Sequence, residues 1–265
     1  MNFKTLLWSF SAAALFAVPQ FAVAENLEGD RFSLSLGVFV TDRDTDTQLD
    51  GTAPGSDINF EKDLGLDTSD TVFRIDGYYR FNERHRVDFS LFDLSRNAST
   101  QINRDLQWGD TTYTVNTVVD TDVDLQIYKA AYTYSFMRRD KGYLGATAGL
   151  YVADTRSSIS EQNLGQATIG EITAPLPVIG LRGEYALSDR WSFRGSGEFF
   201  FIEYEDIDGS LVDLYAGVDY QLLDNMSIGL GVNSVSIDVD ATKTSFAGAL
   251  DWQYVGGLIF LKFNF

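Results

Sequence analysis

The sequence of 265 residues contains no cysteine, one histidine and four prolines. Without cysteine, neither disulfides nor a lipoprotein anchor can hold the chain. Basic residues are also scarce, with 20 Lys and Arg against 38 Asp and Glu, and the net charge of −18 argues against a nucleic-acid partner. After residue 24 no uncharged apolar run reaches the roughly 20 residues that a membrane helix needs.

The first 24 residues have the pattern of a secretory signal peptide. Lys4 precedes the apolar stretch Leu6–Val18, and an Ala-x-Ala sequence ends at Ala24. We expect cleavage after Ala24, which divides the chain into residues 1–24, the signal peptide, and residues 25–265, one barrel domain. Loss of Lys4 changes the net charge from −18 to −19.

The mature chain is rich in residues that form strands and tight turns, with 20 Phe, 13 Tyr, 4 Trp and 23 Gly. The last strand ends on an aromatic residue, and one of its faces carries Val255, Gly257, Ile259, Leu261, Phe263 and Phe265. This ending resembles the C-terminal signature that the assembly machinery of Gram-negative outer membranes reads. The resemblance implies a transmembrane β-barrel in the outer membrane, with that machinery and outer-membrane lipid and lipopolysaccharide as partners.

Alternation of apolar and polar residues predicts an all-β fold, a single closed antiparallel barrel of about ten strands, with eight or twelve as alternatives. The predicted strands are Arg31–Asp42, Val72–Asn82, Arg86–Asn103, Val118–Phe136, Tyr143–Ser157, Val178–Leu187, Trp191–Tyr204, Leu211–Leu222, Met226–Val239 and Phe246–Phe265. A soluble lipocalin-like barrel is the structural alternative, and the terminal Phe and the recurring apolar outward faces oppose it.

The predicted connections alternate in length, as they do in outer-membrane barrels, whose periplasmic turns are short. Short turns are predicted at Glu83–His85, Met137–Gly142, Ser188–Arg190 and Leu223–Asn225, and longer acidic loops at 43–71, 104–117, 158–177, 205–210 and 240–245. Aromatic residues gather beside the short turns, as in an interfacial girdle. Basic residues gather there too, either as part of that interface or simply as solvated turn residues.

The apolar phase changes within the fourth and ninth strands. Val123, Leu125 and Ile127 lie in one phase, whereas Tyr128 and Ala130 begin the other. A β-bulge near the change would explain it. The alternative is a strand that leaves the lipid at that point and continues as an extracellular extension.

The predicted inward face carries charges of both signs. Within a strand, inward residues two positions apart lie roughly 7 Å apart, so opposite charges can pair. We expect these luminal charges to fill a narrow lumen with salt bridges, and the alternative is a polar pathway for small solutes. The predicted luminal charges are Arg74, Asp76, Arg80, Asp88, Arg182, Glu184, Arg194, Glu198, Asp213, Asp219 and Lys262.

Catalytic residues are not recognisable in the sequence. The omptin proteases and the lipid A-modifying barrels use a histidine at the outer rim, whereas His85 lies in a predicted periplasmic turn. A hydrolase at the outer rim is therefore disfavoured, and we expect a protein that is not an enzyme and uses no cofactor.

A metal site is not predicted either. Asp42, Asp44 and Asp46 resemble the start of a calcium loop, but Thr47 and Ala53 replace its Gly and its final Glu. Weak binding of divalent cations by the acidic loops is a further possible partner interaction, weighed against simple solvation. The loop residues concerned are Asp44, Asp46, Asp50, Asp206, Asp208, Asp238 and Asp240.

One segment resembles a group of uncharacterised proteobacterial outer-membrane proteins. The resemblance is carried by Ile58–Leu66, followed by Arg74–Phe81 and by His85 and Arg86. It implies location and fold but no activity. The sequence therefore predicts a porin-like barrel with a filled lumen, which serves envelope structure or surface interaction. A narrow channel for small cationic or neutral solutes is the second hypothesis.

Overall fold

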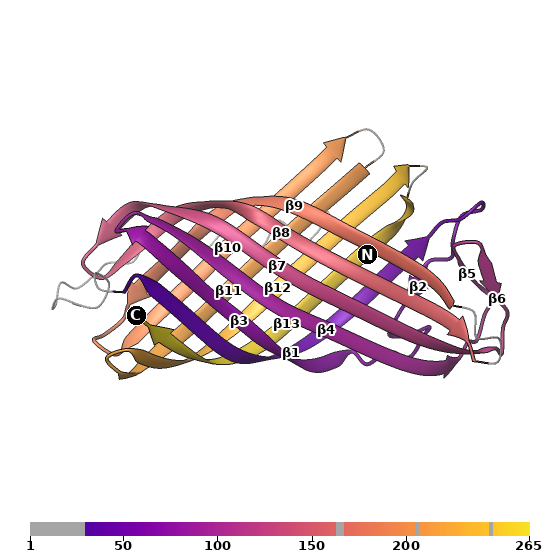
Figure 1. Cartoon of the computed structure of the whole chain (residues 1–265), viewed down its shortest axis with the longest axis horizontal. Helices are drawn as coiled ribbons and strands as arrows, with labels where there is room; N and C mark the ends of the chain where they lie inside the picture. Colours follow the sequence, from indigo (N-terminus) through magenta and orange to yellow (C-terminus); the bar gives the residue numbers. More distant parts are fainter. Residues whose placement is uncertain (1–29, 163–166, 205–206, 244–245) are drawn as a thin grey trace, which may run out of the picture.

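The computed structural model describes residues 30–162, 167–204, 207–243 and 246–265, so the predicted signal peptide lies outside it. Ten long antiparallel strands form one sheet, and its first and last strands, β1 and β13, pair along Ser33↔Asn264 to Leu49↔Gly248. This pairing closes the sheet into the barrel seen in Figure 1. The prediction of a ten-stranded antiparallel barrel is confirmed.

The ten barrel strands follow one another around the wall in chain order. Three short strands lie outside this series, namely β2 (Ile58–Asn59) beside β1, and β5 (Leu106–Trp108) paired with β6 (Thr111–Tyr113). The barrel strands are β1 (Phe32–Leu49), β3 (Ser69–Asn82), β4 (His85–Gln101), β7 (Val118–Arg139), β8 (Gly142–Glu161), β9 (Ala167–Ala186), β10 (Trp191–Tyr204), β11 (Ile207–Leu223), β12 (Met226–Lys243) and β13 (Phe246–Asn264).

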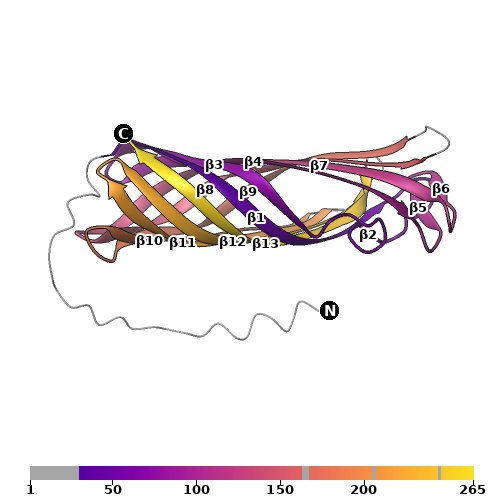
Figure 2. The ribbon, with the colours of Figure 1, turned by 90° about the horizontal axis from the view of Figure 1, so that it is seen from below.

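We call the end of the barrel with the four short connections the turn end, and the opposite end the loop end. Phe265 lies at the turn end, as Figure 2 shows for the C-terminus. Its carbonyl oxygen accepts hydrogen bonds from the amides of Arg31 and Phe32, at 2.8 and 3.0 Å, and its own amide donates to the Phe32 carbonyl at 2.8 Å. The last residue therefore takes part in the closing of the barrel.

The two halves of the barrel have opposite polarity. On β7 the outward residues Ala130 and Tyr132 near the turn end are apolar or aromatic, whereas the outward residues Asp122 and Asp124 near the loop end are exposed and acidic. The inward side changes in the opposite sense, because Lys129 lies in the turn-end half and Leu125, 7% exposed, in the loop-end half. A strand that keeps one register thus has two apolar phases.

The structure rules out a β-bulge as the explanation for the phase change. Strand β7 pairs with β4 without interruption from Val118 to Tyr134, so no bulge lies near Ile127. Strand β12 is likewise continuous against both of its neighbours, and Val235 and Ile237 point inward at 1% and 2% exposed. The strands are extended beyond the apolar band, and their irregular positions, such as the one between Ser135 and Met137, lie at the turn end.

The same feature corrects three predicted loops. Most of 158–177 belongs to β8 and β9, and the described parts of 205–210 and 240–245 belong to β11 and β12. Many of their outward residues are polar, such as Ser158, Ser160, Asp208 and Asp240, which makes the sequence look like loop. Backbone pairing nevertheless continues there, as at Ile159, which points inward and is fully buried.

Barrel closure is incomplete in the loop-end half. Strand β9 pairs with β10 only from Ser192↔Ala186 to Phe199↔Ile179, and β3 pairs with β4 no farther than Arg74↔Phe92. Beyond these pairs the wall consists of two half-sheets, β4-β7-β8-β9 and β10-β11-β12-β13-β1, which diverge in Figure 1.

The segment between β1 and β3 covers the gap beside β4. Phe60, Leu64 and Leu66 are nearly fully buried there, in a cluster with Trp108 of β5 and Ile159 of β8. The described chain forms a short packing segment at this place, with no helix.

Replacing Phe265 with Ser should lower the amount of folded barrel in outer membranes several-fold, because the substitution removes the terminal aromatic of the assembly signal. The matched control is Phe201→Ser, since Phe201 and Phe265 are equally exposed outward aromatics, at 67% and 66%. The heat-dependent shift in gel mobility of isolated membranes measures the folded fraction. Equal amounts of both variants would contradict the proposed signal.

Candidate functional site

The eleven predicted luminal charges lie on the inward face of the turn-end half. Seven are nearly fully buried, and Asp76, Arg80, Arg182 and Arg194 are half-buried. They come from six of the ten strands. On each strand every second residue points into the interior, so the charges of one strand share its inward face.

Lys129 lies at the centre of the charge network, at mid-barrel. Its ammonium group contacts the carboxylate of Glu198 and lies 2.7 Å from a carboxylate oxygen of Asp213. Glu198, only 1% exposed, also accepts a hydrogen bond of 2.9 Å from Arg182. Lys129 is not among the luminal charges predicted from the sequence, because the apolar phase of its strand was ambiguous. An inward Lys opposite two inward acids was the signal that could have identified it.

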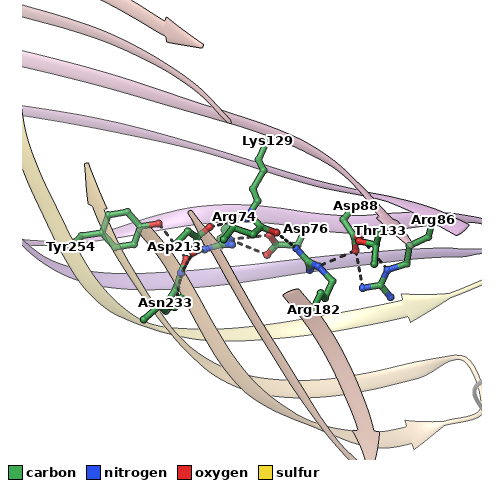
Figure 3. A network of polar contacts seen from close by, with 12 residues as sticks. Arg74, Asp76, Arg86, Asp88, Lys129, Thr133, Arg182, Asp213, Asn233 and Tyr254 are labelled. Atoms are coloured by element: carbon green, nitrogen blue, oxygen red, sulfur yellow. Dashed lines mark hydrogen bonds and ion pairs between the residues drawn. The ribbon is translucent and has the colours of Figure 1, made fainter. Parts of the chain in front are cut away.

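Asn233 links this centre to a second arginine (Figure 3). Its amide nitrogen donates to Asp213 at 2.7 Å, and its amide oxygen accepts from Arg74 at 2.6 Å. The hydroxyl of Tyr254 donates to the same oxygen at 3.2 Å, and Arg74 also bonds Asp76 at 3.0 Å. Five side chains from four strands thus satisfy one another across the lumen.

The network continues toward the turn end. Asp88 lies 3.0 Å from Arg86 and 3.6 Å from Arg182, and it accepts a hydrogen bond of 2.7 Å from Thr133. Arg86, which the sequence placed among the basic turn residues, is instead inward and 6% exposed. Asp219 lies 2.7 Å from Arg194 and 3.4 Å from Lys262.

A layer of aromatic side chains lies next to the network on its loop-end side. The rings of Phe39 and Tyr254 meet edge to face at 5.5 Å, and the guanidinium of Arg74 lies 5.5 Å above the rings of Phe39 and Phe92. Gly256 makes room for this layer, because a Cβ atom there would lie 2.5 Å from the Phe39 ring. The charges and rings together fill the lumen at mid-height.

Free space remains on both sides of this plug, in two cavities of about 70 Å³ each. The turn-end cavity is polar and is lined by the charges and by Ser33, Ser35 and Ser90. The loop-end cavity lies between the two half-sheets and is mainly apolar, with Leu125, Ile237 and Trp252 in its wall. We call this second space the chamber.

Two arginines are buried in the loop-end half, and their surroundings differ. Arg96 lies 2.5 Å from Glu61, which also accepts a hydrogen bond from the Thr45 amide at 2.8 Å. The guanidinium of Arg43 is fully buried, makes no hydrogen bond with any described residue, and lies 3.7 Å from Asp70. Burial and the nearby Arg96 lower the pKa of Arg43 to about 10.

Acidic side chains of the loop end have protein partners. The carboxylates of Asp44 and Asp46 both accept hydrogen bonds from the side-chain amide nitrogen of Asn59, at 2.7 and 2.8 Å. Both residues lie within strand β1 and not in a loop. Hydrogen bonds from Thr52 lower the pKa of Asp110. Asp206 lies outside the described residues, and the described ones contain no group of three side chains placed to hold a metal. Cation binding by these loops stays a prediction.

The single histidine lies far from the loop end. His85 begins β4 at the turn end, where its ring contacts the Tyr132 hydroxyl and its centroid lies 5.2 Å from that of Tyr134. A carboxylate partner that would activate it is absent among the described contacts of the ring.

Comparison with known proteins finds no matching family and no matching curated sequence. Solved structures match the fold. The outer-membrane protease OmpT of Escherichia coli aligns over 88% of this chain and 96% of its own, with 10% identity and a TM-score of 0.57. The toluene transporter TodX of Pseudomonas putida aligns over 91% of both chains, with 8% identity and a TM-score of 0.36.

Ail, the attachment invasion locus protein of Yersinia pestis, aligns over 88% of this chain and 99% of its own, with 12% identity and a TM-score of 0.34. The match to the outer-membrane protease OmpT shows the fold, and the fold of this chain is of the outer-membrane β-barrel class. No helix within the described ranges is long and apolar enough to span a membrane.

Replacing Lys129 with Met should lower the free energy of unfolding by about 3–5 kcal/mol, because Glu198 and Asp213 would stay buried without their cation. Urea titration of the refolded barrel in lipid vesicles measures the change. The control is Arg156→Met, which removes a pair with Glu171 that is 55% and 60% exposed, and should cost at most about 1 kcal/mol. Equal costs would refute a structural role for the network.

The barrel should lose stability when Arg96 is replaced with Met but not when Arg43 is. Arg96→Met leaves Glu61 buried and unpaired and should destabilise the barrel by about 3–5 kcal/mol. Arg43→Met removes a buried cation that makes no hydrogen bond and should leave stability unchanged or raise it. The same urea titration compares them, and a large loss for Arg43→Met would show that this guanidinium has a strong partner.

Proposed function

We propose that this protein is an integral barrel of the Gram-negative outer membrane, exported through a cleaved signal peptide, which neither conducts solutes nor catalyses a reaction. Its turn end faces the periplasm and its acidic loop end faces outward. It serves envelope structure or surface interaction, and lipid and lipopolysaccharide surround it.

The outward face of the turn-end half supports the membrane location. Large apolar side chains are about half exposed there on strands all around the wall, including Val40 at 52%, Phe73 at 57%, Leu230 at 55% and Ile259 at 58%. Such a continuous apolar surface would be costly in water and is stable in lipid. On β1 it ends between Val40 and Asp42, where outward residues become acidic.

The filled mid-barrel carries the proposal of a closed lumen. Lys129, Glu198 and Asp213 satisfy one another across the interior, and Phe39, Phe92 and Tyr254 cover them. A solute on its way through would have to separate buried ion pairs and displace aromatic rings. Ten-stranded barrels are only slightly wider than those whose interiors side chains fill.

The exterior of the loop-end half supports a role in surface interaction. Outward acidic residues recur on its strands, with Asp93 on β4, Asp122 and Asp124 on β7 and Asp154 on β8, all exposed. This surface favours cationic partners, including divalent cations shared with lipopolysaccharide phosphates.

A narrow diffusion channel is the second candidate, and the polar cavity in the turn-end half favours it. For conduction, the aromatic layer would have to move aside. A hydrolase at the outer rim is disfavoured, because the only histidine of the chain, His85, lies at the turn end.

Conductance in a planar lipid bilayer tests the closed lumen. We expect the inserted wild-type barrel to be silent, and the double variant Phe92→Ala with Tyr254→Ala to show steady steps, because it removes two rings of the aromatic layer. The control is Phe199→Ala with Phe201→Ala, which removes two outward rings whose centroids lie 6.1 Å apart. Steady cation-selective steps in the wild type would establish the channel instead.

A further inference from the structure

We propose that the chamber of the loop-end half, which measures about 70 Å³, binds the carbonyl end of a long-chain acyl group whose remaining chain extends through the gap between β9 and β10, and that the indole nitrogen of Trp108 donates a hydrogen bond to its carbonyl or carboxylate oxygen. This inference goes beyond the proposed function and does not depend on it, since the chamber lies on the loop-end side of the plug. The argument rests on the walls of the chamber, its open side and the unsatisfied indole nitrogen of Trp108.

The walls of the chamber are apolar over most of their area. The two half-sheets contribute inward side chains that face each other across it, and Phe60 and Trp108 cover it from the loop end. Water makes few hydrogen bonds in such a space, and apolar ligands are favoured there. The apolar lining residues are Leu49, Leu94, Val123, Leu125, Ala153, Ala174, Ile237, Val239, Leu250 and Trp252.

The polar residues of the lining are mostly satisfied by the protein itself. Arg96, the buried charge in the wall, pairs with Glu61 at 2.5 Å, and only its Nε finds no acceptor among the described residues. Thr47 donates to the Ala249 carbonyl at 3.1 Å. Glu171 is exposed and lies 2.8 Å from Arg156. The chamber therefore offers little to a polar or charged ligand.

The chamber adjoins the open part of the wall. Gly170, Glu171 and Ala174 line it and lie on the part of β9 beyond Ile179, where the described β10 no longer pairs with β9. The outward residues where this gap begins are apolar, with Ile179 56%, Phe199 43% and Phe201 67% exposed. The gap thus begins at the height of the apolar band, and an acyl chain can reach the chamber from the membrane side.

Trp108 supplies the second, independent observation. Its side chain lines the chamber, the residue is 2% exposed, and its Nε1 finds no hydrogen-bond acceptor among the described residues. A buried indole N–H usually has a partner, because leaving it unsatisfied is unfavourable. An oxygen on an otherwise apolar ligand would satisfy it, and an acyl group combines such an oxygen with a long apolar chain.

Tryptophan fluorescence provides the test, because bromine atoms quench a nearby indole. The mature chain has Trp108, Trp191 and Trp252, and Trp191→Phe leaves the two that line the chamber. This variant, refolded into vesicles, is titrated with dibromostearate. In a second arm the vesicles contain phospholipid with brominated chains and no fatty acid is added. Saturable quenching in the first arm identifies a free fatty acid as ligand, and quenching in the second identifies a membrane lipid.

Two pairs of variants in this background locate the ligand. Ala153→Phe fills the chamber and should abolish most of the quenching, whereas Ala148→Phe, at an exposed outward position of the same strand, should not. Trp108→Phe keeps the ring and loses the donor. In this variant the quenching of Trp252 fluorescence reports binding. The affinity for dibromostearate should fall roughly 3- to 10-fold, and the affinity for a dibrominated alkane should stay unchanged.

Absence of quenching in both arms would overturn the proposal, as would equal quenching in Ala153→Phe and Ala148→Phe. An unchanged affinity of Trp108→Phe for dibromostearate would overturn the role of the indole nitrogen. The heat-dependent gel shift of each variant shows that the barrel has folded, so a failure to bind is not mistaken for a failure to fold.

Discussion

Backbone pairing between the first and last strands is the constraint on which the rest of this structure depends. In lipid every backbone amide and carbonyl must find a partner within the protein, and a closed ring of strands provides one for each. Strands β1 and β13 pair over their whole shared length, and the terminal Phe265 adds the last bonds of that seam. Closure then forces every second side chain into a narrow interior, where polar groups have to find partners among one another.

The interior solves this problem differently in its two halves. Where the exterior is apolar, the interior holds charges that pair across the barrel, with Lys129 and Arg182 among acids from other strands. Where the exterior is acidic, the interior is apolar, and a second core forms around Phe60 and Trp108. This half begins at the edge of the apolar band, and there its wall opens between β9 and β10, beside the chamber.

Particular residues show how far sequence patterns predict this architecture. Phe73, Ile75 and Tyr79 alternate with Arg74 and Tyr78, so the direction of each side chain on β3 follows from a period of two. Prediction was less successful at Val123 and Lys129, because alternation reveals which residues share a face but not which face is inside. That distinction requires knowing where lipid ends and water begins. The loops 158–177 and 240–245 were misjudged for the same reason.

The sequence by itself determined the all-β class, the ten strands, the turns and eleven of the luminal charges, because these depend on local alternation and on turn residues. Only the tertiary structure decided which charges meet, since Lys129, Glu198, Asp213 and Asn233 come from four strands separated by up to 104 positions in the chain. It also decided that the strands extend beyond the apolar band and that the two half-sheets separate, with the chamber between them. Those features arise from packing between distant strands, which no local pattern encodes.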